Sequence, residues 1–564
     1  MPEGAAIAPV ILATDKTQLT QFSGNKCAYP VYLTLGNIPR AIRRKPSEHA
    51  CILIGYLPVS KVDKQGLTKR ERKARMQKLF HMTMRLILKP LVKAGKEGVN
   101  VTGGDGCVRR VYPILASYVA DYPEQCLVTC SKYGTCPKCQ CPADKLEADA
   151  PADPRTPCRT KDIIRDAWAA GRTPANAEAI CMERDVSGTV RDPFWADLPY
   201  ADIHLSITPD VLHQLYQGVF KHIVSWCQDL LSPEELDRRL RCLPPGNGIR
   251  HFKNGISGLS QITGMEMKQM ARVLLPCLVG KISKSTLLVF RSLLDFIYLA
   301  QYSTHDDDTL KYMEDALKVF HQNKKVLVQL GIRKTLNIPK FHSLLHYAQS
   351  IRQFGTTDNY NTEMFERLHI DFAKDAWRAT NHRDEFPQMI KWITRKEKMS
   401  LYEMFQRESQ LQEPVRSRSD TLSDEDSCPP IPTPAELVED ATSIIKIAKF
   451  SPSPQQHLRR IQERHSAPGF TTALTHYLNG LQPVQLHLSR QELARTWLPF
   501  EHVNIYHKFQ LKPCALTDGK EESDVVKAIP GSIRMGGRDR FDNVIVLDKD
   551  EAESTGVQGM FGTS

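Results

Sequence analysis

Two stretches of the chain place an aspartate where it could hold a divalent cation. Asp15 follows the apolar run at 10–14, and Asp121 follows the apolar run at 111–120. A carboxylate at the end of a buried strand is costly to bury unless it is paired or bound to a cation. One such aspartate is more typical of a turn. Two of them, together with a glutamate-bearing helix, favour a site for a hard cation such as Mg²⁺, which takes oxygen ligands.

The glutamates lie within residues 359–374. The apolar residues of this stretch recur at helical spacing: Met364, Phe365, Leu368 and Phe372. The pattern predicts a helix capped by Thr362, with Glu363 and Glu366 one turn apart and away from the apolar stripe. His369 follows close behind. Two carboxylates and a histidine at this spacing suit a metal or acid/base task, and they equally suit an ordinary solvated face.

Cysteines form a second group of candidate ligands. The pair Cys136-Pro-Lys-Cys139 has the spacing that places two thiolates on one zinc ion. The remaining ligands could be Cys130, Cys141, Cys126 or distant residues. Free buried cysteines are the plainer alternative, because reduced cysteine behaves as a small apolar residue.

A helix beginning near residue 209 carries Asp210 and His213 one turn apart, on a face other than its buried one. A histidine in this setting is more often structural than a ligand. A zinc hydrolase built on His204, His213 and the cysteines is a further alternative. The chain has no His-Glu-x-x-His pattern to support it.

The elements that would position these groups follow from apolar patterning. Four apolar runs predict strands: 10–14, 29–35, 51–57 and 111–120. A helical stripe runs through 76–91, short helical pieces lie near 160–185, and 225–335 is nearly all helix. We therefore expect an α/β core interrupted by a large, mainly helical insertion, followed by a small α+β C-terminal domain.

Basic residues gather at two places: at Lys69, Arg70, Arg72 and Lys73, and around Arg378. Such a run is usually a solvated helix end. The more specific alternative is contact with the phosphate backbone of a nucleic acid. The net charge of +11 favours a polyanionic partner only weakly. The 15 cysteines are odd in number and irregularly spaced, which favours a reducing compartment. We expect no membrane partner, because no apolar run reaches the length of a span.

The 564 residues suffice for several domains. We expect these parts: 1–142, the first part of the core with the cysteine knuckle; 143–335, the helical insertion; 336–412, the last part of the core; 413–436, a disordered linker; 437–550, an accessory domain; and 551–564, a disordered tail. The linker prediction rests on a segment rich in Ser, Pro, Asp and Arg.

Several motifs occur together in a specific order: Leu12-Ala-Thr-Asp-Lys-Thr-Gln-Leu19, Ala120-Asp-Tyr-Pro-Glu-Gln125, Cys136-Pro-Lys-Cys139, Asp202-Ile-His204, Thr208-Pro-Asp-Val-Leu-His-Gln-Leu215, Thr362-Glu363 with Glu366 and His369, and Arg378-Ala-Thr-Asn381. Through them the chain resembles the Plavaka-type transposases of fungal DNA transposons, within the Kyakuja–Dileera–Zisupton group. The region 437–559 also resembles a C-terminal domain found in many such proteins.

The resemblance implies an RNase H-like catalytic core with the helical insertion placed before its last acidic residue. It implies a DDE/D transposase that holds two Mg²⁺ or Mn²⁺ ions on Asp15, Asp121 and Glu363, with Glu366 as the alternative third carboxylate. The metals would drive cut-and-paste DNA strand cleavage and transfer. The Asp210-x-x-His213 pair and His369 would support this site. Cys136 and Cys139 resemble the family's zinc knuckle.

The same resemblance implies DNA as partner, both transposon ends and target, a homo-oligomer on that DNA, and a nuclear location. Relatives usually carry a zinc-finger region ahead of the first strand. Asp15 lies almost at the N-terminus here, which suggests a truncated or degenerate copy. The alternative function is a catalytically inactive, transposon-derived module that binds DNA or protein.

Overall fold

The structure is a computed structural model of the 564-residue chain. It describes the chain apart from these residues: 1, 3, 21–24, 60–65, 104, 170–171, 245, 247–248, 261, 412–443, 447, 449–450, 466, 482–486, 494, 513–523, 530–539, 542–543, 548–559 and 564. The chain divides into two compact units, Met1–Arg416 and Ser417–Ser564. The predicted linker at 413–436 lies outside the described residues.

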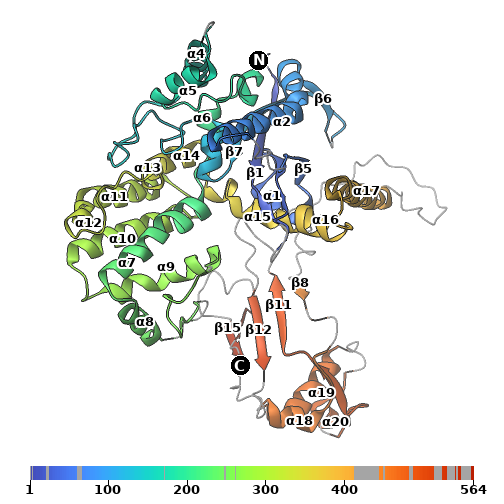
Figure 1. Cartoon of the computed structure of the whole chain (residues 1–564). Coiled ribbons are helices and arrows are strands. Elements are labelled where there is room, and N and C mark those ends of the chain that lie inside the picture. The colour runs from blue at the N-terminus through green and yellow to red at the C-terminus, as the bar shows by residue number, and fades with distance from the viewer. Residues whose placement is uncertain are drawn as a thin grey trace, which may run out of the picture. The chain divides into compact units, whose positions relative to one another are not determined.

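The first unit is a mixed α/β structure built around a five-stranded sheet (Figure 1). Its strands, in spatial order, are β5 (Cys51–Tyr56), β4 (Pro30–Leu35), β1 (Ala6–Thr14), β7 (Val108–Val119) and β6 (Val99–Thr102). β4 pairs antiparallel with both β1 and β5, and β6 pairs antiparallel with β7. The central pair, β1 and β7, is parallel. Both strands of that pair therefore end at the same edge of the sheet.

Both faces of the sheet are covered, because alternate residues of β1 enter two different cores. Val10 and Leu12 pack with the long helix α2 (Lys69–Glu97) on one face. Ile11 and Ala13 pack on the other face with α15 (Thr362–His369). Helix α2 begins with a capping box between Thr68 and Glu71, as expected for a helix entered from a loop.

The long stretch between β7 and α15 is mainly helical and has an apolar core of its own. Its elements are α3 (Tyr122–Val128), α4 (Pro157–Ala167), α5 (Pro174–Glu183), η2 (Phe194–Asp197), α6 (Ile203–Ser206), η3 (Val211–Phe220), α7 (Lys221–Leu230), α8 (Pro233–Cys242), α9 (Gly264–Leu278), α10 (Lys284–Leu299), α11 (Asp307–Asn323), α12 (Lys325–Gln329), α13 (Pro339–His342), η4 (Ser343–His346), α14 (Tyr347–Phe354) and η5 (Thr357–Asn359). Figure 1 shows these helices beside the sheet.

Smaller elements complete the first unit: β2 (Thr17–Gln18), β3 (Cys27–Ala28), α1 (Arg40–Arg43), η1 (Pro46–Glu48), η6 (Ile370–Lys374), α16 (Asp375–Arg378) and α17 (Glu385–Leu411). The four predicted strands and the predicted helix through 76–91 are confirmed. The predicted cap of α15 is wrong. Asn361 caps that helix, and the Thr362 hydroxyl instead donates a hydrogen bond to Asp210, 2.8 Å away. No helix of the described residues is long and apolar enough to cross a membrane.

The described residues of the second unit form short strands and short helices: β8 (Ile444–Lys446), β9 (Ser453–His457), α18 (Leu458–Arg464), α19 (Phe470–Gly480), α20 (Arg490–Leu493), β10 (His502–Ile505), β11 (Lys508–Lys512), β12 (Asp524–Ile529), β13 (Arg540–Phe541), β14 (Val544–Leu547) and β15 (Met560–Thr563). The mixed α+β character predicted for this region is therefore present. The predicted tail at 551–564 includes β15, which pairs with β14, and its other residues lie outside the described part.

Candidate active site and metal centre

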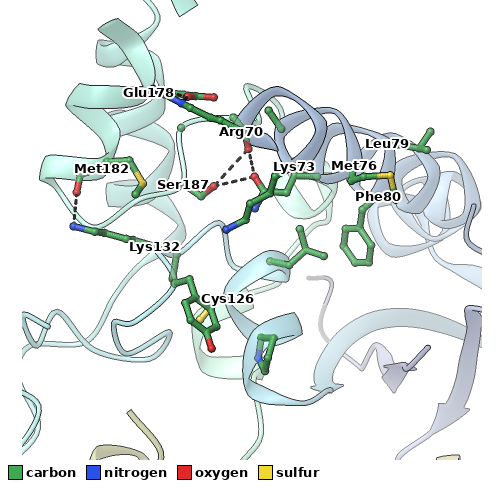
Figure 2. Close-up of a pocket in the computed structure, with 18 of the residues that line it drawn as sticks. Arg70, Lys73, Met76, Leu79, Phe80, Cys126, Lys132, Glu178, Met182 and Ser187 are labelled. Carbon is green, nitrogen blue, oxygen red and sulfur yellow. Dashed lines mark hydrogen bonds and ion pairs between the residues drawn. The ribbon is translucent and has the colours of Figure 1, made fainter. Parts of the chain in front are cut away.

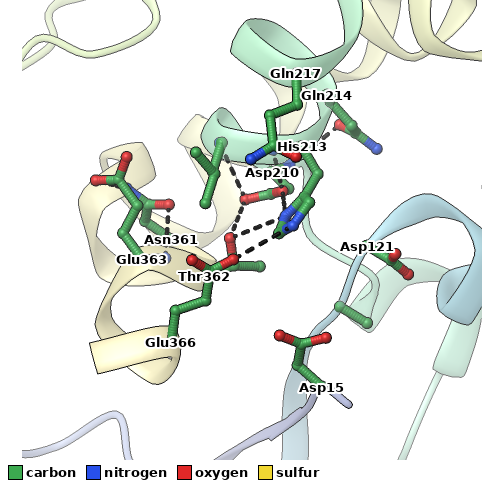
Figure 3. Close-up of polar contacts among 12 residues, drawn as sticks. Asp15, Asp121, Asp210, His213, Gln214, Gln217, Asn361, Thr362, Glu363 and Glu366 are labelled. Carbon is green, nitrogen blue, oxygen red and sulfur yellow. Dashed lines mark hydrogen bonds and ion pairs between the residues drawn. The ribbon is translucent and has the colours of Figure 1, made fainter. Parts of the chain in front are cut away.

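Asp15 and Asp121 stand at one edge of the sheet because the parallel strands β1 and β7 both end there (Figure 3). Asp15 directly follows β1. Asp121 follows β7 and is the N-cap of α3, where its carboxylate accepts a hydrogen bond from the backbone N–H of Glu124 at 3.0 Å. The strand ends thus place both acidic side chains as the sequence predicted.

His369 fixes the Asp15 side chain from the facing helix α15. Its Nε2 lies 3.1 Å from Asp15 Oδ2, and its Nδ1 lies 3.0 Å from the Tyr32 hydroxyl. The imidazole is buried, whereas the Asp15 side chain is 36% exposed. A buried ring held at both nitrogens gives the carboxylate a defined orientation.

The two glutamates of α15 point to different partners. Glu366 Oε1 lies 3.3 Å from His213 Nε2. Glu363 Oε1 lies 2.5 Å from Lys268 Nζ, an ion pair with the helical region. Figure 3 shows Glu366 on the side of the helix that faces Asp15, with Glu363 turned away. The structure therefore brings together Asp15, Asp121 and Glu366, and engages Glu363 elsewhere.

Asp210 and His213 join the helical region to α15. Asp210 caps η3 by accepting hydrogen bonds from the backbone N–H groups of Leu212 and His213. Its Oδ2 also lies 2.7 Å from His213 Nδ1, and its Oδ1 accepts a hydrogen bond from the Thr362 hydroxyl. One buried carboxylate therefore holds the imidazole that Glu366 contacts. The supporting role that the family resemblance implies for this pair stays a prediction.

The protonation of these groups follows from burial and neighbouring charge. Burial raises the pKa of Asp121. Burial, and then the nearby negative charges of Asp15 and Asp210, raise the pKa of Glu366 to about 7. Burial disfavours the charged form of His213, yet Asp210 and Glu366 together raise its pKa to about 9. The acidic neighbours therefore favour the protonated form of His213, while burial and like charges favour the neutral form of Glu366.

This arrangement fits a divalent cation. Three carboxylates converge, and two of them resist ionisation because their charges are desolvated and close to other acidic groups. A bound cation would favour their ionised forms. Oxygen donors from aspartate and glutamate are the ligands that Mg²⁺ and Mn²⁺ prefer.

A separate cluster contains two thiols and two imidazoles. The ligand atoms of Cys136, Cys139, His342 and His346 all lie within 4.8 Å of one another, and all four residues are buried. Cys136 Sγ is 3.3 Å from His346 Nε2, and Cys139 Sγ is 3.2 Å from His342 Nε2. These separations suit a tetrahedral zinc ion with Zn–S near 2.3 Å and Zn–N near 2.0 Å.

Sequence reasoning missed the two histidines of this cluster. The available signal was His342-x-x-x-His346, which together with Cys136-x-x-Cys139 gives a common pattern of zinc ligands. The other predicted ligand candidates are not among these four residues, although Cys141 packs beside Cys136 and Cys139. Cys130 Sγ is 3.7 Å from His81 Nε2, and Cys141 Sγ is 3.3 Å from the carbonyl of Lys145.

Two lysines connect this cluster to the carboxylates. Lys138, between the two cysteines, donates to the carbonyl of Ile207 at 2.6 Å, shortly before Asp210 in the chain. Lys340, two residues before His342, donates to the carbonyl of His213 at 2.8 Å. Burial lowers the pKa of Lys340, while the nearby charges of Asp121 and Asp210 oppose that change. Two residues next to the cluster in sequence therefore contact the segment that carries the Asp210–His213 pair.

The predicted DNA-contacting residues differ in their surroundings. Arg70 forms an ion pair with Glu178, and Arg378 lies 2.7 Å from Asp375. Lys69 and Lys73 are exposed on the first turns of α2. Arg70 and Arg378 are thus each paired with a carboxylate, while Lys69 and Lys73 have no ion pair among the described residues.

Comparison with protein families gives a match to the Plavaka transposase model over residues 1–227. The matched region contains Asp15, Asp121, the Cys136–Cys139 pair and the Asp210–His213 pair, and it ends before α15. The resemblance read from the sequence motifs is therefore confirmed over this region. A search of curated proteins gives no match.

Proposed function

We propose that this chain, whose residues 1–227 carry the Plavaka transposase region, is a metal-dependent enzyme that cleaves and transfers DNA strands. The observation that carries the proposal is the convergence of Asp15, Asp121 and Glu366 from two strand ends and a facing helix. We assign the third carboxylate to Glu366, because Glu363 is engaged by Lys268.

The sheet supports an RNase H-like core for this enzyme. Three antiparallel strands, β1, β4 and β5, are followed by the helix α2 and by β7, which lies parallel to β1 on its other side. Beyond β7, Ile207 forms an isolated parallel bridge with Tyr118. The first acidic residue follows the first strand, the second follows the strand beside it, and the third lies on the late helix α15.

The protein's own groups would hold and orient the reactants. Asp15, Asp121 and Glu366 would hold the metal ions, which supply the activated nucleophile and stabilise the leaving oxygen when bound. His369 would keep Asp15 in place through the 3.1 Å contact. Protonated His213 would favour the ionised form of Glu366, and Lys340 would add positive charge near Asp121.

The cluster of Cys136, Cys139, His342 and His346 would hold a structural zinc ion. Four protein ligands leave no open position for a substrate, which separates this site from a catalytic zinc. Its role would be to fasten the chain from α13 to η4 against the knuckle, and so to keep His213 in reach of Glu366. A zinc hydrolase is therefore not the function we propose.

DNA is the proposed partner, and the net charge of +11 predicts that binding weakens as salt rises. The function is tested by nicking of a supercoiled plasmid in the presence of Mg²⁺ or Mn²⁺. We compare the wild type with Asp121→Asn, and with Asp192→Asn as a control on an exposed residue outside the site. Thermal unfolding of each variant establishes that it is folded.

The proposal predicts nicking that requires the metal, disappears in Asp121→Asn and persists in Asp192→Asn. Nicking that Asp121→Asn retains would contradict the proposed site. A folded wild-type protein that binds DNA but cleaves none with either metal would instead favour the inactive, transposon-derived binding module.

A further inference from the structure

A cavity of about 960 Å³ lies on the α2 side of the first unit, apart from the carboxylates (Figure 2). Its walls come from the first half of α2, from α3 and the segment at 131–133, and from α5 with the segment at 187–189. The volume is in the range of sites that bind small organic ligands.

The floor of the cavity is apolar and partly aromatic. Leu57, Leu79, Phe80 and Leu127 line it, together with the ring of Tyr29. Tyr133 also lines the cavity, and its side chain is 63% exposed. A flat apolar ligand could therefore lie on this floor with an exposed aromatic ring beside it.

The rim of the cavity is cationic. Arg70, Lys73 and Lys132 line it. Arg70 is paired with Glu178, and Lys132 donates to the carbonyl of Met182 at 3.2 Å. Lys73 has no ion-pair partner among the residues that the structure describes, and Figure 2 shows it reaching from α2 into the cavity. An anionic group of a ligand could therefore bind at the rim, at the ammonium group of Lys73.

The cavity lies at the same edge of the sheet as the carboxylates. β5 runs parallel to β1, because both are antiparallel to β4, so Leu57 after β5 lies at the edge where Asp15 follows β1. Tyr29 joins the two places directly. It lies beside the buried Glu124, whose backbone N–H donates a hydrogen bond to Asp121.

We propose that this cavity binds an unpaired nucleotide of a DNA substrate, with the base on the apolar floor beside Tyr133 and a phosphate at Lys73. The inference rests on DNA being the partner in the proposed function. An apolar floor recognises the face of a base, which a duplex hides by stacking, and a cationic rim recognises the backbone next to it. Neither feature alone would select a nucleotide.

The test compares two DNA duplexes that differ only in a short single-stranded extension, which carries 2-aminopurine as a fluorescent base. Binding is measured by titration with wild type, Ala74→Trp and Lys73→Ala. Ala74 lines the cavity, so a tryptophan there fills it. Lys78→Ala is the matched control, because Lys78 is an exposed lysine of the same helix that does not line the cavity.

We expect the wild type to bind the extended duplex about tenfold more tightly than the blunt one, with a change in 2-aminopurine fluorescence. Ala74→Trp should abolish this preference, Lys73→Ala should reduce it, and Lys78→Ala should retain it. Equal affinity of the wild type for both duplexes would overturn the inference, and so would a preference retained in both cavity variants. Either result leaves metal-dependent nicking untouched. Failure of the wild type to bind any DNA would instead overturn the proposed function together with this site.

Discussion

Glu366 Oε1 lies 3.3 Å from His213 Nε2, so a side chain of α15 meets a side chain of the helical region beside the ends of β1 and β7. The contact decides which glutamate faces Asp15 and Asp121. The helical stretch between β7 and α15 supplies both the Asp210–His213 pair and the lysine that engages Glu363.

Removing the imidazole that holds Asp15 should weaken cleavage without removing a metal ligand. His369→Ala should lower metal-dependent nicking about 10- to 100-fold and raise the Mn²⁺ concentration needed for half-maximal rate, because Asp15 loses its orienting contact. His369→Gln should lose less, since its amide can still donate to the carboxylate. If His369→Ala needed the same Mn²⁺ concentration for half-maximal rate as the wild type, the role of His369 in orienting Asp15 would be contradicted.

Purified protein should contain one zinc ion per chain, measurable by elemental analysis. Cys139→Ser and His342→Ala should each lose that zinc and lower the thermal unfolding midpoint, because four distant side chains are no longer tied together. Cys141→Ser should keep the zinc, since Cys141 lies outside the cluster. Zinc retained by both ligand variants would show that the four residues form no metal site.

Acid should destabilise the fold through His81. Burial lowers the pKa of His81 to about 4, well below its ordinary value of 6.5. The ring is held neutral because its Nδ1 accepts the backbone N–H of Phe194 while its Nε2 faces the carbonyl of Leu127. The unfolded chain therefore binds more protons between pH 4 and 6.5, so stability falls as pH drops through that window.

The measurement is urea unfolding of the wild type and His81→Gln at pH 7 and pH 5. His81→Gln should be less stable than the wild type at pH 7. It should also lose less stability on acidification, the difference approaching about 1.4 kcal/mol per pH unit within the window. Parallel losses in the two proteins would show that His81 does not contribute to the acid sensitivity.

Local patterning was enough to predict the strands and the two aspartates. The runs at 10–14 and 111–120 are apolar because both faces of the sheet are covered, and each ends just before its aspartate. The parallel pairing of β1 and β7 then brings the two carboxylates to one edge. This part of the site needed no information from distant segments.

The remaining assignments depend on contacts between segments far apart in the chain. Thr362 has the character of a helix cap, but its hydroxyl is used by Asp210. The choice between Glu363 and Glu366 is made by Lys268 and His213, which no pattern within α15 reveals. His342 and His346 come to the cysteines only when the helical region folds back on the Cys136–Cys139 segment.

The most direct test of the carboxylate centre compares Glu366→Gln with Glu363→Gln in the plasmid-nicking assay. The two changes are chemically identical and lie one turn apart on the same helix, so each controls for the other. We predict that Glu366→Gln lowers nicking at least about hundredfold and weakens Mn²⁺ binding, while Glu363→Gln stays within a few-fold of the wild type. Loss of activity in Glu363→Gln with activity retained in Glu366→Gln would contradict the centre formed by Asp15, Asp121 and Glu366.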